Sequence, residues 1–233
     1  MTLHRSISLM AAAVPALLSA TASAGLAFSF ADPVPGKQFS NLQANQAGAG
    51  SGVMSYDQFA QIAFLVDGST ESNPFSNVWA NARMEMAMTI YTGTTAGGIF
   101  SAPVSGYFRV FDATTGADIV RGDATSGAFL RVSGTSSVML SSESGFSYTF
   151  GAALTNLLSS TGNSGHLPLD PQEAVFTLTD ATAVGGGSLI GAGGVVKSFS
   201  ANASFSGNVA TTPAPGAMAL LGLAGFAGRR RRA

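Results

Sequence analysis

The side chains that could act as acids, bases or metal ligands are few in this sequence. The chain has 2 histidines and 12 acidic residues but no cysteine, which excludes thiol nucleophiles, zinc thiolate sites and disulfides. His4 lies in the N-terminal segment, so His166 is the one candidate base, although a lone loop histidine is usually solvated. Asp170 and Glu173 could orient it or share a metal. With Pro171 between them, however, this pair is typical of the first turn of a helix.

Two further groups of carboxylates could do chemistry. Asp67 and Glu71 lie in the polar loop "DGSTESNP" and are candidates for the paired acids of a hydrolase, although exposed loop acids mostly serve solvation. Asp112, Asp118 and Asp123 belong to Asp/Thr/Gly-rich turns, which makes them weak candidates for a calcium site. Because no known calcium-loop spacing is present, we assign no metal ligand, and we expect no cofactor and no catalytic residue.

Aromatic residues offer a second kind of site. Trp79 is the only tryptophan, and Tyr91 lies on the polar side of its segment, so the two could stack against sugar rings. The alternative, which we favour, is that Trp79 anchors the core beside "FSNVW".

Alternating apolar and polar residues predict that the body is made of strands. In "RMEMAMTIYT", Met84, Met86, Met88 and Ile90 share one face, and in "VKSFSANASFSGNV" the same is true of Phe199, Ala201, Ala203 and Phe205. We expect the second segment to be the last strand of the body.

An internal repeat links further strands. "DATTGADIVRG" from Asp112 is followed by "DATSGAFLRVS" from Asp123, and each copy opens with a turn signal. With "YFRVF" before them, the copies predict a three-strand antiparallel meander with a turn at each aspartate. Segments 58–66 and 150–160 are ambiguous between helix and strand. The sequence therefore predicts an all-β fold, an antiparallel β-sandwich or jelly roll with at most one short helix.

The N-terminal segment, residues 1–24, is typical of a cleavable secretory signal peptide. A weakly positive start is followed by the apolar stretch "ISLMAAAVPALL", and Ala22 and Ala24 are the small residues that a signal peptidase requires. We expect cleavage after Ala24 and a folded domain over residues 25–210.

The C-terminal segment, residues 211–233, combines a proline-rich linker, an apolar run and a basic cluster. Residues 217–228 carry no charge. As a helix they would span about 18 Å against a hydrocarbon thickness of ~30 Å. The positive-inside rule would hold Arg229, Arg230, Arg231 and Arg232 on the cytoplasmic side, so we expect a short transmembrane helix.

This tail resembles the PEP-CTERM sorting signal, with Pro213-Ala214-Pro215-Gly216 as its motif and Ala214 in place of the usual glutamate. The resemblance covers only about the last twenty residues. It implies processing by an exosortase, a membrane-embedded cysteine transpeptidase of bacteria whose genomes commonly also encode exopolysaccharide production. Exosortase and signal peptidase are thus the expected partners, with exopolysaccharide as a further candidate. The expected location is the inner membrane in transit, and then the cell surface or extracellular matrix.

Charge excludes one class of function. Arg5 and the four C-terminal arginines account for 5 of the 11 basic residues, which leaves 6 basic and 12 acidic residues in the body. Such an acidic body argues against nucleic-acid binding. The sequence favours a non-enzymatic exported structural or adhesive protein. The alternatives are a carbohydrate- or calcium-binding module and a secreted hydrolase that uses acidic residues.

Overall fold

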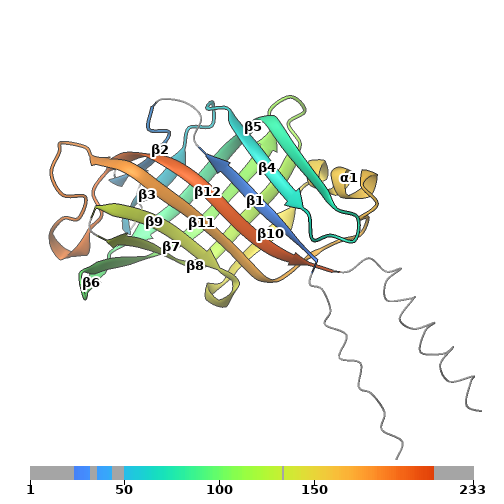
Figure 1. Ribbon diagram of the computed structural model, residues 1–233. Coiled ribbons are helices and arrows are strands. Elements are labelled where there is room, and N and C mark those ends of the chain that lie inside the picture. The colour runs from blue at the N-terminus through green and yellow to red at the C-terminus, as the bar shows by residue number, and fades with distance from the viewer. Residues whose placement is uncertain (1–23, 32–35, 44–49, 133, 213–233) are drawn as a thin grey trace, which may run out of the picture.

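The computed structural model describes residues 24–31, 36–132 except 44–49, and 134–212. Most of them belong to one antiparallel sheet of 12 strands (Figure 1). In chain order these are β1 Gly25–Ala31, β2 Phe39–Leu42, β3 Gly50–Tyr56, β4 Ile62–Gly68, β5 Phe75–Tyr91, β6 Thr94–Ala96, β7 Ile99–Asp112, β8 Asp118–Val132, β9 Thr135–Ser141, β10 Phe146–Phe150, β11 Pro168–Ala183 and β12 Phe199–Thr211. The expected all-β, antiparallel architecture is confirmed, with one α-helix, α1 Ala152–Ser160, and the short 3₁₀ turns η2 Ser142–Ser144 and η3 Ala192–Gly194.

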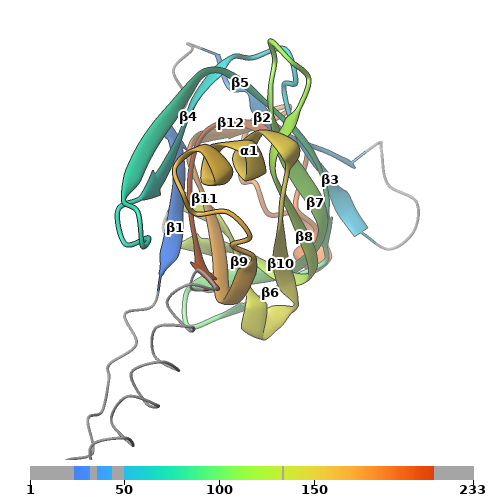
Figure 2. The ribbon, with the colours of Figure 1, turned by 90° about the vertical axis from the view of Figure 1, so that its right-hand side faces the viewer.

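The sheet closes on itself. Successive pairings run β1–β12–β11–β9–β8–β7–β5–β4 and return to β1, so the first and last strands are neighbours. The short strands β2 and β3 lie between the beginning of β12 and the end of β5, and β10 pairs with β8. Figure 2 shows α1 lying across one end of the closed sheet.

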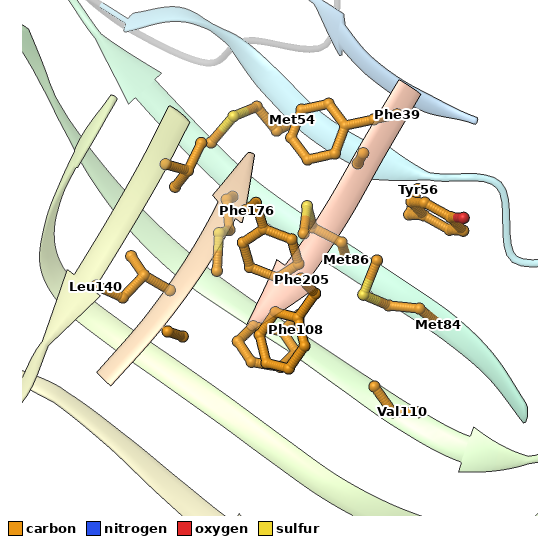
Figure 3. Packing of buried hydrophobic residues seen from close by; sticks show 14 of the residues in the cluster. Phe39, Met54, Tyr56, Met84, Met86, Phe108, Val110, Leu140, Phe176 and Phe205 are labelled. Atoms are coloured by element: carbon orange, nitrogen blue, oxygen red, sulfur yellow. The ribbon is translucent and has the colours of Figure 1, made fainter. Parts of the chain in front are cut away.

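The inward faces of the strands build one apolar core. The expected alternation in β5 and β12 is confirmed, because Met84, Met88 and Phe199 are at most 1% exposed. At the centre, the rings of Phe108, Phe176 and Phe205 lie 4.9–5.3 Å apart, centroid to centroid (Figure 3). These three rings come from β7, β11 and β12, so the core ties together strands from the middle and the end of the chain.

The two segments that are ambiguous in the sequence form different secondary structures. Residues 62–68 form strand β4, whereas residues 152–160 form α1, which buries Leu154 and Leu158.

The meander prediction is correct about its first turn and wrong about its second, because the segments expected as its second and third strands form the single strand β8. Asp112 does begin a turn between β7 and β8, but Asp123 lies inside β8. There Asp123 pairs with Tyr107 of β7 on one side and with Ser147 of β10 on the other. Pairing on both sides outweighs the local turn propensity.

Candidate functional site

A buried acid–histidine cluster lies at the end of the sheet that α1 covers. Oε2 of Glu71, in the loop between β4 and β5, is 2.7 Å from Nδ1 of His166, and both side chains are fully buried. Oγ1 of Thr211, at the end of β12, donates a hydrogen bond of 2.7 Å to Oε1 of Glu71. The cluster thus joins two loops to the last strand.

Asparagines hold the two loops against each other. Nδ2 of Asn163 donates to the carbonyl of Asn73 at 2.8 Å, and the amide of Asn73 donates to Oδ1 of Asn163 at 3.2 Å. Nδ2 of Asn73 also donates to the carbonyl of Gly162 at 2.9 Å. This pairing fixes the loop after α1, so it sets where His166 enters the interior.

The expectation of a solvated His166 and an exposed Glu71 is wrong. His166 and Glu71 are each 4% exposed, and a buried carboxylate requires a partner of this kind. The partner of His166 is Glu71 rather than Asp170 or Glu173. These two acids do not begin a helix either: they belong to β11, where Glu173 pairs with Asn208 of β12.

The cluster supplies an imidazole that a carboxylate positions through Nδ1. Nδ1 and Oε2 lie in close contact without an aligned hydrogen bond, and Nε2 of His166 is buried with no hydrogen-bond partner among the described residues. A histidine base in a hydrolase instead bonds a nucleophilic hydroxyl through its second nitrogen. The geometry therefore provides an oriented polar group without the third member of a triad in the described part of the chain.

Sequence reasoning missed a second cluster, the outer ladder, on the solvent side of β5, β7 and β8. Arg109 bridges two carboxylates, with Nε 2.8 Å from Oε2 of Glu85 and Nη1 2.9 Å from Oδ1 of Asp118. Arg121 pairs with Asp123 at 2.6 Å, and its guanidinium lies 4.1 Å from the ring centroid of Tyr107. The signal was present in the sequence, since the polar positions of these strands alternate with buried ones.

Hydrogen bonds in the outer ladder shift the pKa values of its side chains. The Tyr107 hydroxyl and the Arg109 guanidinium, in that order, lower the pKa of Glu85. The same bond to Glu85 raises the pKa of Tyr107. Hydrogen bonds to Glu85 and Asp123 raise the pKa values of Arg109 and Arg121 respectively. All of these groups are thus held in their ordinary ionisation states at neutral pH, as expected of a structural network.

The three calcium candidates do not come together. Asp118 and Asp123 are paired with arginines of the outer ladder. Asp112 closes its turn instead, and the hydrogen bond from the backbone N–H of Thr114 lowers its pKa. Across the described ranges, no group of three or more His, Asp or Glu residues is placed to hold a metal ion.

The two hydrolase candidates are also separated in role. Asp67 accepts a hydrogen bond of 2.9 Å from the amide of Ser69 and so shapes the turn after β4, whereas Glu71 is buried against His166.

The proposed pair of stacking aromatics is not formed. Trp79 packs against the core, which confirms the alternative that we favoured. Tyr91 is 41% exposed near the far end of the same strand, where its hydroxyl lies 3.1 Å from Oγ of Ser105.

Most of the expected processing residues lie outside the described residues. These are Ala22, the motif 213–216 and the arginines 229–232. Ala24 is described, and its carbonyl accepts a hydrogen bond of 3.0 Å from the amide of Thr211. Within the described ranges, no helix is long and apolar enough to cross a membrane.

Comparison with known proteins gives no relative. No protein family, curated protein or solved structure matches the chain.

Proposed function

We propose that this chain is a non-enzymatic protein of the cell surface or extracellular matrix, exported through its signal peptide and sorted through its PEP-CTERM-like tail. The observation that carries the proposal is the pairing of the first and last strands. Gly25 lies opposite Ala210, so the two terminal segments join the domain at neighbouring points. A domain tethered there would be held by one end while the rest of its surface stays free.

The attachment of the tail supports a role as a tether. Thr211 is bonded to Glu71, while the amide of Thr212 donates to the carbonyl of Leu167 at 3.1 Å. The amide of Leu167 donates in return to Oγ1 of Thr212 at 3.0 Å. The domain is therefore fixed up to the residue before Pro213, and the accessible part of the chain would begin at the processing motif.

The non-enzymatic part of the proposal rests on the sequence, which contains no recognised catalytic motif. The acid–histidine cluster fits this interpretation, because it connects the last strand to the loops that surround it. In this role it keeps the point of attachment folded.

The intact mass of the protein from membrane and external fractions of its native host tests the proposal. We expect the external protein to begin at Gly25 and to end within residues 213–216. A variant with Arg229–Arg232 changed to Gln should lose external protein, whereas Lys197→Gln, which removes one basic residue from the body, should not.

A mass that retains the four arginines and is found only in membranes would contradict the sorting proposal. It would indicate that the tail is a permanent anchor.

A further inference from the structure

Two open pockets lie on the outer surface of the closed sheet. The first pocket has a volume of about 450 Å³ and is formed mainly by β8, β9 and β11. The second pocket, of about 300 Å³, is formed mainly by β1, β12 and the loop after β4. Exposed side chains line both of them, among them Met139 and Glu173 in the first pocket and Asn208 in the second. A ligand could therefore reach these side chains directly from solvent.

One row of paired residues joins the two pockets. Glu173 of β11 lies opposite Ser141 of β9 on one side and Asn208 of β12 on the other. Asn208 in turn lies opposite Ala27 of β1, which pairs with Asp67 of β4. Ser141 and Glu173 line the first pocket, and the other three residues line the second. Figure 1 shows the five strands side by side; because neighbouring strands lie about 4.8 Å apart, this cross-strand row is about 19 Å long.

The first pocket has an apolar end and a polar end. Ala128, Met139 and Val175 lie opposite one another on β8, β9 and β11 and form the apolar end. Glu173 and Ser144 lie toward η2, and both are exposed. None of the described residues forms an ion pair or a side-chain hydrogen bond with either of them. The carboxylate and the hydroxyl are thus available to a ligand that also offers apolar surface.

A sugar ring has the same division of polar and apolar groups. Its hydroxyl groups surround a carbon skeleton whose C–H faces are apolar. A carboxylate is a strong acceptor for hydroxyl groups, and a serine hydroxyl both donates and accepts. A ring whose C–H face lies on Met139 and Val175 would direct hydroxyl groups toward Glu173.

Charge limits the partner further. None of the described residues that line either pocket is Lys or Arg, whereas Glu173 and Asp67 place one carboxylate in each. A polyanion would meet two negative charges without a counter-charge, and an apolar peptide would bury a carboxylate without a partner. A single carboxylate in each pocket is also too few ligands for a metal ion such as calcium. A neutral chain rich in hydroxyl groups meets none of these penalties.

We propose that the two pockets and the cross-strand row between them bind a neutral polysaccharide chain that lies across the strands, with one sugar ring in the first pocket against Met139 and Glu173. The first pocket falls within the roughly 300–1,000 Å³ typical of ligand sites. The length of the row favours a chain of several rings over a single sugar. The inference goes beyond the proposed function and does not depend on export or sorting.

The methyl group of Met139 allows a direct test. In the full chain labelled with ¹³C-methyl methionine, Met139 is 46% exposed in the first pocket, whereas Met84 and Met88 are fully buried and serve as internal controls. Met139→Leu identifies the Met139 signal by its loss. The neutral probes are cellohexaose, maltohexaose, mannohexaose and chitohexaose, each compared with its own monosaccharide, and hexagalacturonate is the charged chain.

We expect at least one neutral chain to shift the Met139 signal saturably and to leave the buried methionines unchanged. That chain should bind at least about tenfold more tightly than its monosaccharide, which corresponds to roughly 1.4 kcal/mol. Hexagalacturonate should bind more weakly than the active neutral chain.

Matched variants locate the effect. Glu173→Gln should weaken binding of the active chain about fivefold, because a hydrogen bond to a charged group is stronger than one to a neutral amide. Glu143→Gln changes an exposed glutamate that lines neither pocket, so binding should be unchanged. Asn208→Ala should weaken binding of the chain but not of its monosaccharide, since Asn208 lines only the second pocket. Backbone amide spectra check that the variants are folded.

Four results would overturn the proposal. The first is a Met139 signal that none of the neutral chains shifts. The second is tighter binding of hexagalacturonate than of every neutral chain. The third is an equal loss of binding in the two glutamate variants. The fourth is a Met139 signal that shifts when the protein concentration alone is raised, which would make the first pocket a contact between copies of this chain.

Discussion

The hydroxyl of Thr211 offers the sharpest test of the acid–histidine cluster. Thr211→Val keeps the shape of the side chain but removes the hydrogen bond of 2.7 Å to the buried Oε1 of Glu71. A hydrogen bond to a charged group contributes about 1.5–3 kcal/mol, and a buried carboxylate oxygen left without its donor has no water to replace it. For a domain of this size, 1 kcal/mol corresponds to roughly 2–4 °C in Tm, so we expect Tm to fall by about 3–12 °C.

Urea unfolding followed by the fluorescence of Trp79 measures the underlying loss of unfolding free energy. Trp79 is the only tryptophan and packs against the core, so its emission reports on the whole domain. Thr179→Val is the matched control, because Thr179 is exposed on β11. Thr211→Ser should recover much of the loss, since it restores the hydroxyl. The reasoning is refuted if Thr211→Val and Thr179→Val unfold at the same urea concentration.

Three further predictions concern the rest of the fold. The pKa of Glu85 is lowered, so the outer ladder stabilises the fold at pH values above the ordinary carboxyl range. This contribution, at most about 1 kcal/mol for so exposed a pair, is lost as the pH falls through the lowered pKa. Arg109→Met should flatten that dependence in urea unfolding at a series of pH values. Gly106→Ala should cost at least about 1–3 kcal/mol in unfolding free energy, since φ at Gly106 is +139° and a Cβ there would lie 2.2 Å from the carbonyl oxygen of Ala87. Gly116→Ala is the control, and because a Cβ at Gly116 would point into open space, it should cost less. Phe108→Ala should cost about 3–5 kcal/mol by the same measurement, and a loss below 1 kcal/mol would show that the ring is not central to the core.

The fold class could be predicted because its signal is local. Alternation places Met84, Met86 and Met88 on one face whatever the neighbouring strands are, and the same holds for Phe199 and Phe205 in the last strand. The second turn of the repeat shows the limit of such signals. Its local sequence favours a turn, but partners on both sides keep that segment extended.

The acid–histidine cluster could not be predicted from the sequence. Glu71 and Thr211 are 140 positions apart, and nothing near either residue indicates its partner. Polarity and the neighbouring loop residues made His166 and Glu71 typical of solvated positions. Only closure of the sheet brings β12 beside the two loops and removes water from them.

The pairing of the first and last strands also has a consequence for biosynthesis. β12 pairs with β1, β2 and β11, so each of these three earlier strands lacks one of its two neighbours until β12 has been synthesised. Contacts between such distant segments slow folding, and unpaired edges promote aggregation. A nascent chain would therefore stay open until β12 has been synthesised, and a chain that ends before β12 could not close. Closure of the sheet is thus restricted to chains that include β12.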